Sequence, residues 1–266
     1  MERLGDVAPG NVARFMTPAG TEVVGELLEG AARANGLSYP LADIRFLVPV
    51  VPTKVICVGL NYVDHIDEIG MDRPDEPLLF LKPPSSLVGH AEAIVRPPDV
   101  SRLDYEGELA VVIGRRASRV ALQEALDYVA GLTIGNDVTA REYQVPGSQW
   151  TRAKGYDTFA PVGPCLVQGT DWSGRRIETR VNSRLVQSST TDRLIFDVPT
   201  LIAHASSIMT LEPGDVILTG TPRGVGPVAN GDVIEIAIEG IGTLRNYVAG
   251  GLDAEPSVAK ESRQAS

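Results

Sequence analysis

The 266-residue sequence contains few of the residues on which several classes of protein depend. Its two cysteines, Cys57 and Cys165, lie in apolar segments typical of buried strands, and two are too few for a disulfide framework in a chain of this length. Long apolar runs are also missing, since no stretch approaches the roughly 18 residues that a membrane-spanning helix needs. The first residues have no basic start followed by an apolar stretch, so we expect a cytoplasmic protein.

Concentrated positive charge is absent as well. The formal net charge is −10, the sequence pI is near 4.8, and the lysines and arginines are scattered along the chain. This distribution argues against nucleic acid and anionic membranes as partners, because both are recognised by clustered cations. A small anionic substrate is compatible with it, provided that positive side chains gather locally.

Turn-forming residues and short apolar segments are abundant. The chain contains 27 glycines and 19 prolines, and hydrophobic residues make up 43% of it, which favours a globular fold of many short strands. A helix is predicted after Asp137, because Thr139 and Glu142 have the spacing of a capping box. Residues 176–189 alternate like the two strands of a hairpin. The three other segments with helical spacing are residues 63–70, 120–129 and 198–211.

Glu106 and Glu108 stand one residue apart at the head of an apolar, β-branched run. Side chains alternate along a strand, so both carboxylates point the same way, about 7 Å apart at Cβ, and Asp104 extends the row. Asp137, at the end of another predicted strand, adds a further acid. Such oxygen ligands suit Mg²⁺ or Mn²⁺, whereas the presence of only three histidines disfavours zinc. The alternative is a solvated strand face and an aspartate that caps a helix.

A histidine and a glutamate share one face of the helix predicted at residues 63–70. His65 and Glu68 are three positions apart, and a carboxylate beside a histidine fixes its tautomer and raises its basicity. The pair is a candidate general base acting on water. Asp64 and Asp67 leave open the alternative of a solvated acidic helix face.

Two further segments offer groups for an anion. Lys154 is a single cation in a segment with aromatic and glycine neighbours, and it could pair with a substrate carboxylate or with the predicted metal ligands. A lysine in a loop is otherwise usually solvated. Thr219, Gly220 and Thr221 could hold a carboxylate through amides and hydroxyls, although the same residues suit any tight turn between strands.

Six segments, taken in order, resemble the catalytic domain of the fumarylacetoacetate hydrolase family over residues 54–248. They are GLNYVDHIDEIG, LFLKPPSSLVGH, DYEGELAVVIG, GLTIGNDVTAREYQ, WTRAKGYDTFAPVGP and ILTGTPRGVGP. The resemblance implies an α+β, mainly β fold, with a mixed β-roll or β-sandwich catalytic domain at residues 51–248. Residues 1–50 would form a small N-terminal β region, and residues 249–266 are predicted to be a disordered tail.

The resemblance also implies roles for individual residues. The ligands of a Mg²⁺ or Mn²⁺ ion are matched by Glu106, Glu108 and Asp137. His65 and Glu68 match a catalytic pair on a lid helix, which becomes ordered over the site when substrate binds. Lys154 matches a catalytic lysine. The predicted substrate-binding residues are Gln144, Thr221, Gly220, Arg141 and Lys82, the last two in a supporting role. Relatives of this size often form homodimers, so we expect a homodimer.

The activity implied is metal-dependent chemistry on small 2-oxo acids. We expect carbon–carbon cleavage of an acylpyruvate by hydrolysis, or of oxaloacetate by decarboxylation, through an enolate whose charge the ion stabilises. The alternatives are a 2-hydroxyhepta-2,4-diene-1,7-dioate isomerase and, in a different class, a metal-dependent binding module that breaks no bond. Contacts that select the reaction are expected in the lid and in loop residues such as Arg73. Three carboxylates and a dication would leave the site at about −1, a charge that Lys154 would neutralise.

Overall fold

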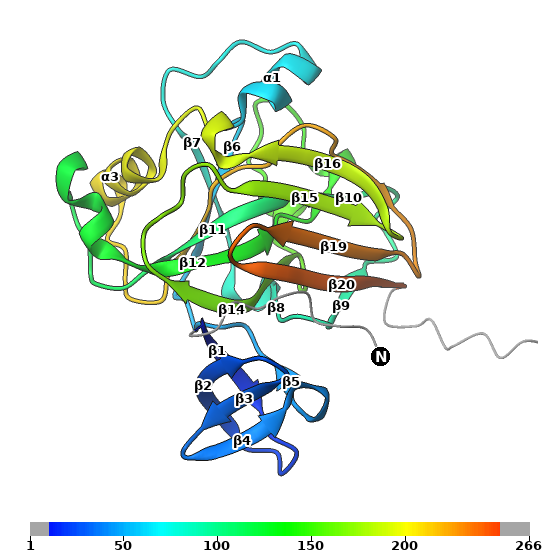
Figure 1. Cartoon of the computed structure of the whole chain (residues 1–266). Coiled ribbons are helices and arrows are strands. Elements are labelled where there is room, and N and C mark those ends of the chain that lie inside the picture. Colours follow the sequence, from blue (N-terminus) through cyan, green and yellow to red (C-terminus); the bar gives the residue numbers. More distant parts are fainter. Residues whose placement is uncertain (1–10, 251–266) are drawn as a thin grey trace, which may run out of the picture.

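The computed structural model describes residues 11–250, which form three β-sheets and few helices (Figure 1). The expected α+β, mainly β fold is confirmed. Among residues 11–250, none of the helices has the length and the apolar character that a membrane span requires. Cys57 and Cys165 are both buried and unpaired, as expected.

The strands of the largest sheet are β1 (Asn11–Met16), β2 (Glu22–Leu28), β3 (Ala31–Ala34), β4 (Leu37–Pro40), β5 (Arg45–Phe46), β6 (Val55–Gly59), β7 (Leu78–Lys82), β8 (Leu87–Val88), β11 (Gly107–Ile113), β12 (Val129–Asn136), β14 (Ala160–Gln168) and β17 (Val216–Leu218). The five-stranded sheet contains β9 (Ala93–Arg96), β15 (Arg176–Val181), β16 (Arg184–Thr190), β19 (Val233–Ile238) and β20 (Gly242–Gly250). The three-stranded sheet contains β10 (Leu103–Tyr105), β13 (Thr139–Ala140) and β18 (Gly226–Val228). The α-helices are α1 (Val63–Ile69), α2 (Thr151–Lys154) and α3 (Val198–Ile208), and 3₁₀ helices span Leu41–Asp43, Pro84–Ser86, Leu122–Tyr128, Arg141–Tyr143 and Thr191–Arg193.

Strand β11 lies inside the largest sheet, between β12 and β17, and is buried on both faces. Leu109 and Val111 face the main core, whereas Ala110 and Val112 face a second apolar cluster. A strand covered on both sides needs apolar residues at every position, which explains why its sequence does not alternate.

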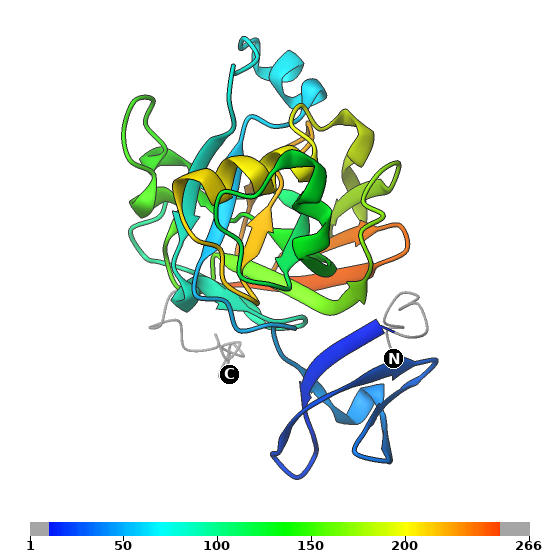
Figure 2. The same cartoon turned by 90° about the vertical axis from the view of Figure 1, so that its left-hand side faces the viewer.

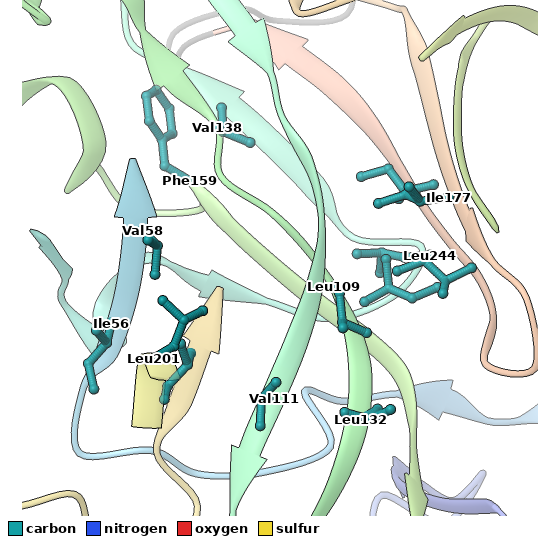
Figure 3. Packing of buried hydrophobic residues seen from close by; sticks show 14 of the residues in the cluster. Ile56, Val58, Leu109, Val111, Leu132, Val138, Phe159, Ile177, Leu201 and Leu244 are labelled. Atoms are coloured by element: carbon teal, nitrogen blue, oxygen red, sulfur yellow. The ribbon is translucent and has the colours of Figure 1, made fainter. Parts of the chain in front are cut away.

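The main core lies between the central strands of the largest sheet and the five-stranded sheet. In Figure 3, Leu109 of β11 lies near Ile177 of β15 and Leu244 of β20. Leu201 of α3 packs beside Ile56 of β6, so the helix covers another part of the same core. This packing fixes the ends of β11 and β12, where the acidic residues lie.

Two of the predicted helices are confirmed. Helix α1 ends at Gly70, whose φ of +66° lies in the left-handed region that glycine favours. Helix α3 begins after Asp197, whose side chain accepts a hydrogen bond from Thr200 N at 2.9 Å. The predicted segment 120–129 forms a 3₁₀ helix instead of an α-helix, and it packs beside α3 (Figure 2).

The hairpin predicted at residues 176–189 is confirmed as the antiparallel pair β15 and β16. Asn182 and Ser183 form its turn, and both have positive φ angles, as in the hairpin turns that match strand twist.

The helix predicted after Asp137 is wrong. Thr139 begins the short strand β13, and only a 3₁₀ turn follows it. The Thr139 hydroxyl donates to the buried carboxylate of Glu106 and to the carbonyl oxygen of Asp137, so it does not cap a helix. Glu142 accepts a hydrogen bond from Ser101 instead. The Thr139 hydroxyl, which the local sequence pattern predicted to cap a helix, therefore binds the buried carboxylate of Glu106.

Strands β1 to β5 surround a separate apolar cluster and project from the rest of the molecule (Figure 1). The members of the cluster are Ala13, Phe15, Leu27, Ala32, Ala34, Phe46 and Cys165. Pairing of Val12 with Leu166 joins β1 to β14, and the domain boundary at residue 50 stays a prediction. Strand β20 continues through Gly250, and the rest of the predicted tail, residues 251–266, lies outside the described residues.

His90 lies where the N-terminal strands meet the rest of the chain. Its ring contacts Phe46 edge-on with the centroids 5.7 Å apart, and its Nδ1 accepts a hydrogen bond from Arg245 N at 3.2 Å. Burial, followed by the charge of Arg245, lowers the pKa of His90 from 6.5 to about 4.

We predict that His90 makes the fold sensitive to mild acid. Below pH 6.5 the unfolded chain binds a proton at this histidine, whereas the folded chain does so only near pH 4, so the free energy of unfolding falls through this window. His90→Asn keeps an acceptor for Arg245 and should remove this contribution, about 2 kcal/mol near pH 4.5. Urea unfolding of both proteins near pH 7.5 and pH 4.5 measures it, and an equal pH dependence would contradict the prediction.

Candidate functional site

The register of two strands brings the predicted metal ligands together. Glu106 directly precedes β11, Glu108 lies within it, and Asp137 directly follows β12. The two strands pair with Gly107 opposite Asn136, and Asp137 N donates to Glu106 O at 2.9 Å. One oxygen from each of the three carboxylates lies within 4.8 Å of the others, and all three residues are buried.

Two buried lysines contact these acids. Lys154 Nζ lies 3.0 Å from Glu106 Oε2 and 2.6 Å from Asp137 Oδ2. Lys82 Nζ donates to Asp137 Oδ1 and, at 2.9 Å, to Val138 O. The side chains of Lys82 and Lys154 are 0% and 2% exposed, so neither is a solvated surface lysine. Lys154 ends the single turn of α2, in a segment that we expected to be an irregular loop.

Asp104 does not belong to the carboxylate group that we expected it to extend. It lies on β10 in the three-stranded sheet, whereas β11 belongs to the largest sheet, so the row of side chains is broken at Glu106. Asp104 accepts hydrogen bonds from Arg102 Nε at 2.9 Å and from Arg141 Nε at 2.8 Å. Arg141 also donates to Glu106 and to the side chain of Gln144, and it therefore links two acids.

The charges of Glu106 and Lys154 stabilise each other. Burial alone would raise the pKa of Glu106, but the charges of Lys154 and Arg141 outweigh it and lower that pKa. Burial would likewise lower the pKa of Lys154, but Asp137 and Glu106 raise it above its ordinary value. Both groups are ionised at neutral pH, so Lys154 acts as a fixed cation.

Glu108 is the least compensated of the three acids. Its Oε2 accepts a hydrogen bond from Gly220 N at 2.6 Å, and no lysine or arginine among residues 11–250 forms an ion pair with it. Burial, followed by the negative charges of Asp137 and Glu106, raises the pKa of Glu108 well above its ordinary value. A cation near this carboxylate would relieve both effects.

The donor set fits a hard divalent cation. Its three members are carboxylates, and hard ions such as Mg²⁺ and Mn²⁺ prefer oxygen ligands. Sulfur and imidazole, which zinc favours, are absent from the group. The side chains that could hold the ion are therefore Glu106, Glu108 and Asp137.

A tight loop after β17 supplies the amide that binds Glu108. Gly220 has a φ of +102°, and a Cβ there would lie 2.8 Å from the Cβ of Asn61, so glycine is required on both grounds. Asn61 Nδ2 donates to Thr219 O at 2.7 Å and holds the loop in place. The Thr221 hydroxyl donates at 3.0 Å to the carbonyl oxygen that precedes Glu108. Sequence reasoning missed Asn61, for which the only signal was a polar residue soon after a buried strand.

Helix α1 is fastened to β16 and to the loop after β17. Asp64 Oδ2 accepts a hydrogen bond from Ser189 Oγ at 2.7 Å, and Glu68 Oε2 accepts one from Gly224 N at 3.0 Å. His65 Nδ1 lies 3.7 Å from Glu68 Oε2, which is longer than a hydrogen bond. The two residues of the predicted catalytic pair are therefore neighbours, but Glu68 binds the backbone and not the imidazole.

Comparison with known proteins assigns the chain to a family. A family model described as fumarylacetoacetate (FAA) hydrolase C-terminal matches residues 54–249. The chain therefore belongs to the fumarylacetoacetate hydrolase family, and the resemblance of the six segments is confirmed. Enzymes of this family include hydrolases, isomerases and decarboxylases, act on small acids and depend on divalent metals.

Three similar proteins have names that describe an activity. The rat mitochondrial oxaloacetate tautomerase Fahd2a is 43% identical over 236 residues, which cover 83% of this chain and 75% of the rat protein. The structure of a 2-hydroxyhepta-2,4-diene-1,7-dioate isomerase from Mycobacterium marinum is 42% identical with a TM-score of 0.83, covering 90% of this chain and 98% of the other. A fumarylpyruvate hydrolase from Pseudomonas aeruginosa, solved with Mn²⁺ and pyruvate, is 32% identical with a TM-score of 0.71, covering 77% and 91%.

We predict that two amide substitutions differ in their effect on metal-free stability. Glu106→Gln leaves the buried Lys154 with one acid fewer and should lower the free energy of unfolding by about 3 kcal/mol. Glu108→Gln removes a buried carboxylate that has no ion-pair partner among residues 11–250, so stability should stay unchanged or rise. Both variants should bind Mn²⁺ at least about 100-fold more weakly. Urea unfolding in EDTA measures the stability of both variants, and calorimetric titration measures their Mn²⁺ affinity. If Glu108→Gln bound Mn²⁺ as tightly as the wild type, Glu108 would be excluded as a ligand.

A second prediction concerns the attachment of α1. Asp64→Ala removes the contacts with Ser189 Oγ and Arg223 N and should increase amide hydrogen exchange across residues 63–70, because local opening then breaks two tertiary hydrogen bonds fewer. Asp67 lies on the same helix, is exposed and makes no side-chain hydrogen bond within the described chain, so Asp67→Ala is the matched control. Equal exchange in the two variants would show that Asp64 does not fasten the helix.

Proposed function

We propose that this chain is a Mg²⁺- or Mn²⁺-dependent enzyme that enolises a small 2-oxo dicarboxylic acid such as oxaloacetate. Charge balance at the site carries the proposal. Four acids and four cationic side chains lie together there: ion pairs join seven of them, and the eighth, Glu108, lies beside Glu106 and Asp137. The acids are Glu106, Glu108, Asp137 and Asp104. The cations are Lys82, Lys154, Arg141 and Arg102.

This balance differs from the one expected from the sequence, in which Lys154 alone offsets the acids. With four cations present, the ionised network is formally neutral before any metal binds, and a bound dication would leave two positive charges uncompensated. A doubly charged anion would restore neutrality at the site, whereas a monoanion would not. The site therefore favours a dicarboxylate over acylpyruvates with one carboxylate.

Different groups at the site would have different roles in the reaction. When bound, the ion would supply Lewis-acid stabilisation of negative charge on the keto oxygen. Lys154 keeps its proton and contributes fixed positive charge beside Glu106 and Asp137. His65 on α1 is the base that would remove a proton from the carbon next to the keto group. Helix α1 would limit the access of water while it stays fastened.

Enolisation is proposed ahead of cleavage for a structural reason. Hydrolysis would require His65 to activate water with Glu68 as its orienting partner, but Glu68 Oε2 binds Gly224 N. Tautomerisation of oxaloacetate and isomerisation of a dienedioate both require proton transfer next to an oxygen-bearing carbon, and relatives of this chain carry both names. Acylpyruvate hydrolysis, oxaloacetate decarboxylation, a homodimer and a cytoplasmic location stay predictions from the sequence.

The test is a spectrophotometric assay of the keto–enol interconversion of oxaloacetate with Mg²⁺, with Mn²⁺ and with EDTA. We expect turnover that needs the ion and a kcat/KM at least about tenfold higher for oxaloacetate than for acetylpyruvate. His65→Ala should lower kcat by about 100-fold or more while keeping Mn²⁺ affinity. His204→Ala on α3 is the matched histidine control and should leave both unchanged.

The other outcomes separate the alternatives. Loss of the acetylpyruvate absorbance without interconversion of oxaloacetate would assign the chain to cleavage. Ion-dependent ligand binding without turnover, unaffected by His65→Ala, would support a binding module. Either result would contradict the proposed enolisation.

A further inference from the structure

The hydroxyl of Tyr62 is a buried polar group without a hydrogen-bond partner among the described residues. The residue is 0% exposed and directly precedes α1, where its carbonyl oxygen accepts a hydrogen bond from Ile66 N at 3.1 Å. A buried hydroxyl that bonds to nothing costs about 1–3 kcal/mol of stability. Replacement by phenylalanine would remove that cost. Folding alone therefore gives no reason for the hydroxyl, whereas ligand binding would.

The chain around Tyr62 connects the lid helix to the acidic group. Its neighbour Asn61 donates at 2.7 Å to Thr219 O and at 3.0 Å to Phe196 O. The residue after Thr219 is Gly220, whose amide binds Glu108. Tyr62 therefore stands at the base of α1, next to the loop that holds the least compensated carboxylate.

The surroundings of the hydroxyl make it a donor. Burial, followed by the negative charges of Glu108 and Asp64, raises the pKa of Tyr62 above its ordinary value, so the phenol keeps its proton at physiological pH. His65 Nδ1, three residues further along, is also buried without a hydrogen bond within residues 11–250. Two buried polar atoms on this short segment therefore have no hydrogen-bond partner within residues 11–250, and each such group requires an explanation.

We propose that the Tyr62 phenol donates a hydrogen bond to an oxygen of the bound 2-oxo acid and thereby positions it beneath α1. The inference rests on the proposed function, since it needs a 2-oxo acid at the acidic group. A carboxylate oxygen of the substrate is the acceptor that fits, because the neutral phenol donates and a dication bound at the acidic group would offset the negative charge of Glu108. No proton transfer from Tyr62 is involved.

Tyr62→Phe tests the contact by binding alone. Oxalate is the probe, because it presents the two adjacent oxygens of a 2-oxo acid and does not react. Calorimetry with the full chain would measure Mn²⁺ affinity first and then oxalate affinity of the Mn²⁺-loaded protein. We expect unchanged Mn²⁺ affinity, oxalate affinity weaker by about tenfold, and an unchanged or higher Tm in EDTA.

The remaining outcomes distinguish this inference from the proposed function. Tyr128→Phe, which alters a tyrosine packed against the core and Arg115, is the matched control and should change none of the three values. Equal oxalate affinity of wild type and Tyr62→Phe would overturn the contact and leave the proposed function standing. A parallel loss of Mn²⁺ affinity or Tm would also overturn it, by assigning the hydroxyl a structural role. Failure of the wild type to bind oxalate with Mn²⁺ would overturn both.

Discussion

Compensation of buried charge is the constraint on which the site depends. A buried ion costs several kcal/mol to remove from water unless its partners lie at hydrogen-bond distance. Lys154 meets this condition through Glu106 and Asp137, which belong to different segments of the chain. The register of β11 against β12 sets the separation of the two acids, and the single turn of α2 sets the position of the lysine. The apolar core beneath them therefore has to fix the strand ends, because a small displacement would leave charges unpaired.

Much of the local structure and the set of acids can be predicted because their signals are local. The apolar run after Glu106 predicts a strand, and Gly70 predicts the end of α1. The spacing of Glu106 and Glu108 points to an ion before any partner is known. Asp137 is harder to place from spacing alone, and the ordered resemblance of six segments links it to the pair.

The partners of the acids could not be predicted from spacing, because tertiary placement decides them. Lys82 contacts Asp137, 55 positions away in the sequence, from a strand whose apolar run gives no sign of an acidic partner. Asp104 continues the row in sequence but lies in another sheet, which no periodicity reveals. Thr139 carries a regular capping pattern, yet a buried carboxylate of Glu106 competes for its hydroxyl more strongly than a helix end would. Each difference arises where a long-range polar contact overrides a local preference.

Some polar groups around the site have charged or hydrogen-bonding partners, and others lack them. This difference determines the order in which the ligands bind. Lys82, Lys154 and their acids are compensated, so they keep their geometry whether or not a ligand is present. Glu108, the Tyr62 hydroxyl and His65 Nδ1 are not, and such groups lower stability until a ligand satisfies them. The three differ in chemistry: the carboxylate suits a cation, the phenol an anionic oxygen, and the imidazole a transferable proton. An anion would meet the unbalanced charge of Glu108 if it entered first, so electrostatics favours the cation first and the 2-oxo acid second. The same order follows from the charge balance of the network, which becomes positive only after the dication is bound.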